Sequence, residues 1–213
     1  MSYLVDIPLE QASTDFNPAV ELYLRRGRLM LSTPNAIYSY DDLYMNFYLA
    51  FDKLGVGKRQ MQHALILGFG TGSIPWMLEK SFHCRLSYTG VEIDEVIAGW
   101  AMRYALPRLQ SPVTLYTTDA VHFAQTWNES FDLICVDIFQ DEHIPESLDE
   151  PLFSENLARL LAPGGLLLWN RLADDAEMKK RTDLFYENVF SKVFPQPGFL
   201  PLGPNRMLVA GLE

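Results

Sequence analysis

The sequence is poor in basic residues. Lys and Arg number 17 against 27 Asp and Glu, which gives a formal net charge of -10 over 213 residues, and no basic run interrupts the acidic background. Because proteins bind nucleic acid largely by neutralising phosphates with Lys and Arg, this balance argues against a nucleic-acid partner. A cationic small molecule suits an acidic chain better.

Long apolar runs are also missing. No stretch approaches the ~20 apolar residues of a membrane span. The first residues, MSYLVDIPLEQ, lack the basic, then apolar, then small-residue order of a secretion signal. We therefore expect a cytoplasmic protein with no membrane partner.

Cysteine is scarce, and the residues that commonly bind metals are dispersed. Cys84 and Cys135 stand far apart in apolar, strand-like surroundings, and there is no CxxC pattern. The four histidines form no cluster in the sequence. We expect both cysteines to be reduced core residues and expect no metal site.

From residue 63 onward, short apolar runs alternate with helical patterns: HALIL, SIPWMLEKS, RLSYTGV, DEVIAGWAMRYAL, VTLYT, AVHFAQTW, FDLICV, PLFSENLARLL and GLLLW. This alternation is typical of a parallel sheet covered by helices on both faces. The runs are apolar almost throughout, as expected for strands buried on both sides. We therefore predict an α/β, Rossmann-like domain over residues 59–213.

Residues 1–58 are predicted to form an extended or hairpin segment, RGRLMLSTPNAIYSYDD, and then a lead-in helix. Apolar residues recur there at helical spacing: Leu43, Phe47, Ala50, Phe51 and Leu54. Near the C-terminus, DDAEMKKRTDLFYENVFSKVF predicts another amphipathic helix. The closing NRMLVAGL predicts a last strand, which returns as a hairpin at the sheet edge.

The segment ALILGFGTGSIPWML carries an apolar strand into a glycine-rich turn and then a helix. Gly68, Gly70 and Gly72 let the backbone approach a ligand closely, and the helix start offers free N–H groups. We predict a nucleotide-like ligand here, with a purely structural turn as the alternative. Ser73 replaces the third glycine of the G-x-G-x-x-G pattern, which disfavours a dinucleotide. The ring of Phe69 either contacts a cationic ligand or packs in the core.

The segments YTGVEID and TTDAVHF place carboxylates after the second and third predicted strands. Glu92 is predicted to accept hydrogen bonds from both hydroxyls of a ribose. Asp94 has two alternatives, a ligand contact or the N-cap of the next helix. Asp119 is expected to accept from the exocyclic amine of adenine, to cap a helix, or to do both.

The fourth strand ends in FDLICVDIFQDEHIPE. We predict that Asp137 is a general base, which deprotonates or orients an attacking amine or hydroxyl. Gln140 and Asp141 follow in the loop and are candidates for binding substrate, although a solvated acidic loop is the alternative for Asp141. The ring of Phe139 is a further candidate for ligand contact.

Together, ALILGFGTGS, GVEID, TTDA, VDIFQDEHIPESLDEPLF and LLAPGGLLLW resemble the class I S-adenosylmethionine-dependent methyltransferase superfamily, and specifically its spermidine synthase-like branch. YSYDDLY resembles the stretch before that family's main domain, so the resemblance covers roughly residues 25 to 211. It implies a seven-stranded sheet with an antiparallel last strand, S-adenosylmethionine or its decarboxylated form as cofactor, and a homodimer. It also implies roles for seven residues: Gly68, Gly70 and Gly72 beneath the nucleoside, Glu92 at its ribose, Asp119 at its adenine, Asp137 as the acid of the catalytic loop, and Tyr44 beside an amine substrate.

Two positions depart from the aminopropyltransferase pattern. Thr71 stands where that family has an aspartate in the glycine-rich loop, and Gln140 replaces a second aspartate of the catalytic loop. We therefore expect a methyl transfer to a small amine or hydroxyl acceptor. The alternatives are aminopropyl transfer to a diamine such as putrescine, and a module that binds the nucleoside without turnover.

Overall fold

The computed structural model describes residues 5–140 and 143–211. Its strands form two sheets, a four-stranded sheet in the order β1-β2-β3-β4 and a seven-stranded sheet in the order β10-β11-β9-β8-β5-β6-β7. The strands are β1 (Ile7–Ala12), β2 (Val20–Arg25), β3 (Arg28–Ser32), β4 (Ile37–Ser39), β5 (His63–Leu67), β6 (Ser87–Glu92), β7 (Val113–Thr117), β8 (Phe131–Val136), β9 (Leu161–Leu172), β10 (Gly198–Leu202) and β11 (Asn205–Ala210).

Helices connect the strands of the larger sheet. The α-helices are α1 (Met45–Lys53), α2 (Ser73–Lys80), α3 (Glu95–Trp100), α4 (Ala120–Thr126), α5 (Pro151–Leu160), α6 (Ala176–Phe185) and α7 (Ser191–Val193). Wider π-helical turns continue α3 over Ala101–Ala105 and join α6 to α7 over Tyr186–Phe190. Short 3-10 helices are η1 (Asp41–Leu43), η2 (Val56–Lys58), η4 (Leu106–Arg108) and η5 (Glu146–Leu148).

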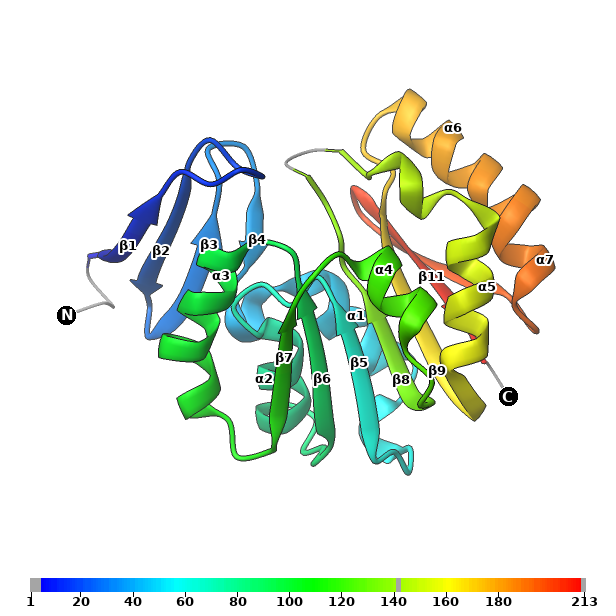
Figure 1. Cartoon of the computed structure of the whole chain (residues 1–213), viewed down its shortest axis with the longest axis horizontal. Coiled ribbons are helices and arrows are strands. Elements are labelled where there is room, and N and C mark those ends of the chain that lie inside the picture. Colours follow the sequence, from blue (N-terminus) through cyan, green and yellow to red (C-terminus); the bar gives the residue numbers. More distant parts are fainter. Residues whose placement is uncertain (1–4, 141–142, 212–213) are drawn as a thin grey trace.

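The larger sheet is parallel from β7 to β9, whereas β11 pairs antiparallel with both β9 and β10. Helices cover both of its faces, with α1 and α2 on one face and α4, α5 and α6 on the other (Figure 1). The predicted α/β Rossmann-like fold is therefore confirmed, including the antiparallel C-terminal strand. The strand β10, inside a segment rich in Pro and Gly, completes the seven and pairs with β11 as the expected hairpin.

Alternating side chains along each parallel strand supply the two core layers. In β5, for example, Ala64 and Ile66 belong to the layer under α1 and α2, while Leu65 and Leu67 belong to the layer under α4 and α5. All four side chains are fully buried, as expected for a strand covered on both faces. Cys84 and Cys135 are free and buried, as predicted.

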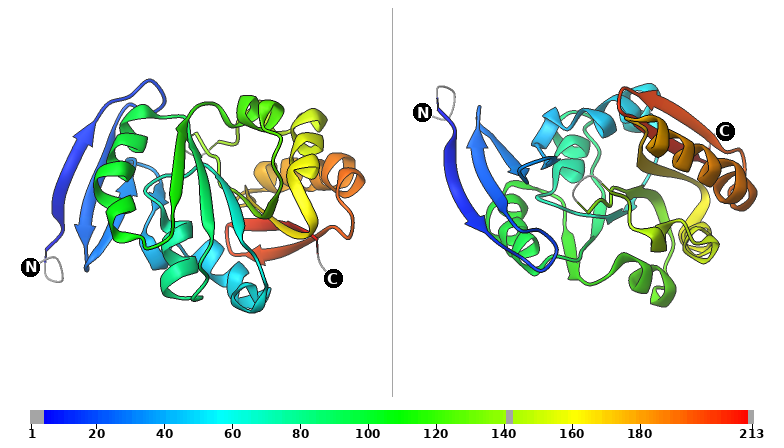
Figure 2. Two further views of the ribbon diagram at one scale, coloured as in Figure 1. Left: turned by 60° about the horizontal axis from the view of Figure 1, so that its bottom comes forward. Right: turned by 90° about the horizontal axis from the view of Figure 1, so that it is seen from above.

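The small N-terminal sheet stands at one end of the molecule and the β10–β11 hairpin at the other (Figure 2). The extended segment predicted from the sequence, residues 26–42, contains β3 and β4, whereas β1 and β2 lie before it. Apolar residues of β2 and β3 pack against Ile97 and Trp100 of α3, which fixes this sheet beside the carboxyl end of β6. The lead-in helix α1 packs instead into the core of the larger sheet, through Phe47 and Phe51.

Candidate functional site

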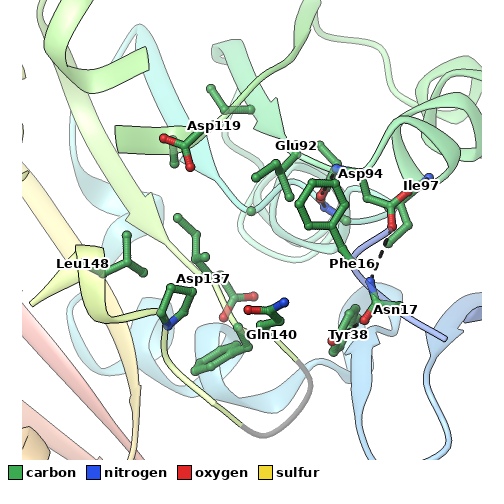
Figure 3. Close-up of a pocket in the computed structure, with 18 of the residues that line it drawn as sticks. Phe16, Asn17, Tyr38, Glu92, Asp94, Ile97, Asp119, Asp137, Gln140 and Leu148 are labelled. Atoms are coloured by element: carbon green, nitrogen blue, oxygen red, sulfur yellow. Dashed lines mark hydrogen bonds between the residues drawn. The ribbon is translucent and has the colours of Figure 1, made fainter. Parts of the chain in front are cut away.

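A cavity of about 230 Å³ opens at the carboxyl ends of the parallel strands. The ends of β5, β6, β7 and β8 form its floor. One wall comes from the N-terminal sheet and the turn before β2, and the opposite wall comes from the segment after β8. In Figure 3, Glu92 and Asp119 lie on one side of the cavity, and Asp137 and Gln140 lie across from them. In open α/β sheets this is the edge where ligands bind.

The glycine-rich turn after β5 lies against the end of β8. Gly68 has a φ of +82°, and a Cβ at this position would overlap the carbonyl oxygen of Asp137. Gly70, with a φ of +53°, directs its N–H to Glu92. Gly68 and Gly70 line the cavity, whereas Gly72 is the left-handed N-cap of α2. The turn therefore brings two of the three predicted glycines to the cavity.

The start of α2 is covered by β4 and the residue after it. The Ser73 hydroxyl lies 2.6 Å from the Ser39 hydroxyl and accepts a hydrogen bond of 2.8 Å from the backbone N–H of Tyr40. In dinucleotide-binding folds the pyrophosphate occupies the corresponding helix start. The packing here favours a ligand without a phosphate at this position.

Phe69 and Thr71 of the glycine-rich turn are buried and are not among the residues that line the cavity. The ring of Phe69 is 3% exposed and packs in the core, where it fills the space that a side chain at Gly90 would need. This placement corrects the expectation of a contact between the Phe69 ring and the ligand, and it agrees with the core-packing alternative. Thr71 is also buried, and its hydroxyl has no hydrogen-bond partner among the described residues.

Glu92, the last residue of β6, is held by two backbone groups. Its Oε2 accepts a hydrogen bond of 2.9 Å from the N–H of Gly70, and its Oε1 accepts one of 3.1 Å from the N–H of Asp94. Burial raises the pKa of the Glu92 carboxyl, although the two backbone hydrogen bonds oppose that shift. Each carboxylate oxygen has a second lone pair, so both oxygens can still accept from vicinal hydroxyls.

Asp94 links the larger domain to the N-terminal segment. Its Oδ1 accepts hydrogen bonds from the N–H groups of Val96 and Ile97. Asp94 is therefore the N-cap of α3, one of the two roles expected for it. Its Oδ2 accepts a hydrogen bond of 2.6 Å from the Thr14 hydroxyl and one of 3.4 Å from the Asn17 amide. Phe16 and Asn17 also line the cavity, and neither was predicted from a sequence pattern.

Asp119 begins α4 at the cavity rim. Its Oδ1 accepts a hydrogen bond of 2.9 Å from the N–H of His122, so it caps the helix, as the sequence suggested. Asp119 also lines the cavity. The position is compatible with the second predicted role, acceptance of a hydrogen bond from a base.

Asp137, which follows β8, lies across the cavity from Glu92 (Figure 3). Its Oδ1 accepts hydrogen bonds from the Tyr44 hydroxyl, at 3.2 Å, and from the Asn170 amide, at 2.9 Å. Burial raises the pKa of the Asp137 carboxyl to about 7, against the lowering effect of these two hydrogen bonds. A carboxyl with this pKa is well matched to proton transfer near neutral pH. Sequence analysis identified Asp137 and Tyr44 but not Asn170.

The loop after β8 supplies the remaining candidates. Gln140 is exposed at the cavity rim, and Phe139 lines the cavity. Asp141, the other predicted substrate-binding residue, lies outside the described residues. Tyr44, Asp137 and Gln140 therefore all line the same cavity.

The cavity is acidic. Glu92, Asp94, Asp119 and Asp137 all line it, and none of the lining residues within the described chain is Lys, Arg or His. Such a lining attracts a cation and disfavours an anionic group. Across residues 5–140 and 143–211, no three or more His, Cys, Asp or Glu side chains gather in a way that could hold a metal ion. In those residues, no helix is both long enough and apolar enough to cross a membrane.

No protein-family model matches the chain. A probable polyamine aminopropyl transferase of Bifidobacterium longum is 36% identical over 107 residues, which are 50% of this chain and 23% of that protein. A polyamine aminopropyltransferase of Vibrio vulnificus is 28% identical over 139 residues, or 62% of this chain and 45% of that protein. The chain thus aligns with less than half the length of either relative.

Solved structures with the same fold include a probable spermidine synthase from Corynebacterium glutamicum, with a TM-score of 0.74 and 20% identity over 95% of this chain and 78% of that one. A spermidine synthase in complex with the transition state analogue AdoDATO has a TM-score of 0.71 and 15% identity over 97% and 75% of the two chains. Human methyltransferase-like protein 13 in complex with SAH has a TM-score of 0.62 and 19% identity over 78% and 82%.

The chain therefore has the fold shared by spermidine synthases and class I methyltransferases. Within that class, the similar curated sequences are polyamine aminopropyltransferases, and the similarity to spermidine synthase structures extends over nearly the whole chain. The predicted resemblance to the spermidine synthase-like branch is confirmed.

Proposed function

We propose that this chain is a transferase that moves the aminopropyl group of decarboxylated S-adenosylmethionine to a small amine. The proposal rests on the acidic cavity, which is lined by four carboxylates and, among its described residues, by no basic side chain. The donor and a protonated amine are cations, so this lining favours both of them. The carboxylate of intact S-adenosylmethionine would find no basic side chain among the described residues of the cavity.

The curated relatives favour aminopropyl transfer over the methyl transfer expected from Thr71. Methyl transfer was the preferred activity because Thr71 and Gln140 depart from the aminopropyltransferase pattern, but the curated relatives are named as polyamine aminopropyltransferases. Methyltransferases are similar to this chain only in fold. The Thr71 side chain, moreover, does not line the cavity, so its identity has little direct bearing on the bound donor.

Three groups of this chain would hold the donor. Glu92 accepts hydrogen bonds from the ribose hydroxyls, since both its oxygens are already oriented by backbone N–H groups. Asp119 receives the adenine amine on the oxygen not used in capping α4. Gly68 and Gly70 allow the nucleoside to lie against the backbone.

The reaction requires an unprotonated amine next to the donor carbon. A C–N bond forms at the aminopropyl carbon attached to sulfur, the C–S bond breaks, and its electron pair stays on the sulfur as a neutral thioether. Asp137 takes the proton that the attacking nitrogen loses. Tyr44 and Asn170 occupy its Oδ1, so Oδ2 is the oxygen available to the amine. The sulfonium already carries the reactivity, and the protein contributes mainly alignment and the base.

The test is a product assay on the purified chain. We expect putrescine and decarboxylated S-adenosylmethionine to give spermidine and 5′-methylthioadenosine by mass spectrometry, and we expect Asp137→Asn to lose this activity. A parallel reaction with S-adenosylmethionine and the same amine tests methyl transfer. A methylated amine in that reaction, with no product from the decarboxylated donor, would overturn the proposal. Tight nucleoside binding without turnover on several amines would instead favour a binding module.

A further inference from the structure

One wall of the cavity is formed by the segment between β8 and α5. Pro145, Ser147 and Leu148 of this segment line the cavity, and Leu148 is only 2% exposed. In its described residues, 137–140 and 143–150, the segment has the 3-10 turn η5 and an isolated bridge between Gln140 and His143, but no longer helix or strand. Side chains from neighbouring elements therefore contribute to holding it in position.

Two arginines hold the end of this wall through a single carboxylate. Asp149 Oδ1 lies 2.6 Å from Nη1 of Arg171, and Asp149 Oδ2 lies 2.7 Å from Nε of Arg181. Arg181, on α6, also donates a hydrogen bond of 2.9 Å from Nη1 to the carbonyl oxygen of Ile144. One guanidinium thus binds both ends of the stretch 144–149, which contains all three wall residues.

Arg171 is fully buried and comes from the end of β9. Its guanidinium packs over the ring of Phe185, 4.2 Å from the ring centroid. Among the described residues, Asp149 is the carboxylate that forms an ion pair with it. A buried charge of this kind is stable only when it is paired, so Arg171 and Asp149 fix each other's position.

Two consecutive residues of β9, Asn170 and Arg171, contact the two ends of the segment between β8 and α5. Asn170 and Arg171 point to opposite faces of the sheet, as neighbours in a strand do. Asn170 binds Asp137, where the segment begins, and Arg171 binds Asp149, where it ends. The strand therefore sets the distance between the candidate base and the nucleoside-facing wall.

We propose that Arg171 and Arg181 are positioning residues that hold the wall at Pro145, Ser147 and Leu148 against the bound nucleoside. This inference rests on the proposed function for the identity of the ligand, but not for the anchoring of the wall. Neither arginine lines the cavity, so neither contacts the ligand. Their contribution to binding is indirect, through the placement of Leu148 and its neighbours.

The first arm of the test measures nucleoside affinity. Arg181→Gln removes the charge that binds both ends of the wall, and Arg206→Gln is the matched control, because Arg206 pairs with Asp183 of the same helix and touches no residue of the wall. Calorimetric titration with 5′-methylthioadenosine is expected to show about fivefold weaker binding for Arg181→Gln and wild-type affinity for Arg206→Gln. Equal affinities for all three proteins would overturn the inference.

The second arm does not need a ligand. Hydrogen exchange of the peptide covering residues 143–150 is expected to be faster in Arg181→Gln than in Arg206→Gln or the wild type. If the wild type binds no 5′-methylthioadenosine, the proposed function fails, and this arm alone decides whether the wall is anchored as inferred. Exchange that is unchanged, or raised equally in both variants, contradicts the anchoring. Arg171→Met is a further variant, expected to raise the exchange of the same peptide. If Arg171→Met does not fold, Arg181→Gln alone carries the test.

Discussion

The Tyr44 hydroxyl donates a hydrogen bond of 3.2 Å to Asp137 Oδ1, although the two residues are 93 positions apart in the sequence. Burial, and next the charge of Asp137, raise the pKa of Tyr44 well above its ordinary value, so the phenol remains a donor. The hydrogen bond joins the N-terminal part of the chain to the candidate base. Because Tyr44 and Asn170 both donate to Oδ1, Oδ2 of Asp137 is the oxygen proposed to accept the proton.

The first prediction concerns pH. Since burial raises the pKa of Asp137 to about 7 and the base must be ionised, kcat/KM is expected to rise with pH, with a midpoint near that value. The Tyr44 hydrogen bond lowers this pKa, so Tyr44→Phe should move the midpoint to higher pH. The ionisation of the amine substrate also contributes to the profile, but it does not change with the variant. An identical midpoint in both proteins would exclude Asp137 as the titrating base.

The second prediction separates catalysis from stability. Asp137→Asn is expected to lower kcat by about a hundredfold to ten-thousandfold. The folded-state pKa of about 7 lies above the ordinary value of 3.8, so ionisation of Asp137 destabilises the fold progressively as pH rises between these values. The asparagine variant avoids this cost, and its gain in melting temperature should be larger at pH 8 than at pH 4. A variant that is less stable at pH 8 would show that the carboxylate is needed for the fold.

The third prediction concerns the ribose contact. Glu92→Ala is expected to weaken the binding of decarboxylated S-adenosylhomocysteine by at least about 1.5 kcal/mol, because hydrogen bonds to a charged group contribute about that much each. Glu92→Gln keeps one acceptor oxygen and should lose less. Titration calorimetry measures both. A loss below about 1 kcal/mol for the alanine variant would refute the ribose role.

The fourth prediction concerns the glycine-rich turn. Gly68→Ala adds a Cβ that overlaps the Asp137 carbonyl, and should lower the free energy of unfolding by at least about 3 kcal/mol. Gly203→Ala is the matched control, since Gly203 also has a positive φ, +66°, but no neighbour within 4 Å. Its cost is the backbone strain alone, about 1 to 2 kcal/mol. Equal losses in urea unfolding would show that the contact with the end of β8 is unimportant.

Local patterns were sufficient to predict much of the fold and part of the site. The parallel strands are short, nearly continuous apolar runs bounded by turn residues, and Glu92, Asp119 and Asp137 each stand at the end of such a run or within two residues of it. The carboxyl ends of parallel strands meet at one edge, so the position of each residue could be inferred from its own segment.

The residues that the sequence did not reveal depend on contacts between distant segments. Asn170 belongs to the apolar run GLLLWN and meets Asp137 across 33 positions. Thr14 meets Asp94 across 80 positions, from a segment without a recognisable pattern. Phe69 illustrates the opposite case, because its sequence position in the turn suggested a ligand contact, and only packing shows that the ring turns toward the core.

If the proposed function is right, the acidic cavity selects a nucleoside donor that lacks a carboxylate. This claim is tested most directly by titrating the wild-type chain with S-adenosylhomocysteine and with its decarboxylated form, two ligands that differ in that one group. We expect the decarboxylated compound to bind at least about tenfold more tightly, because no basic side chain among the described cavity residues pairs with a carboxylate. Equal affinities, or tighter binding of S-adenosylhomocysteine, would contradict the claim.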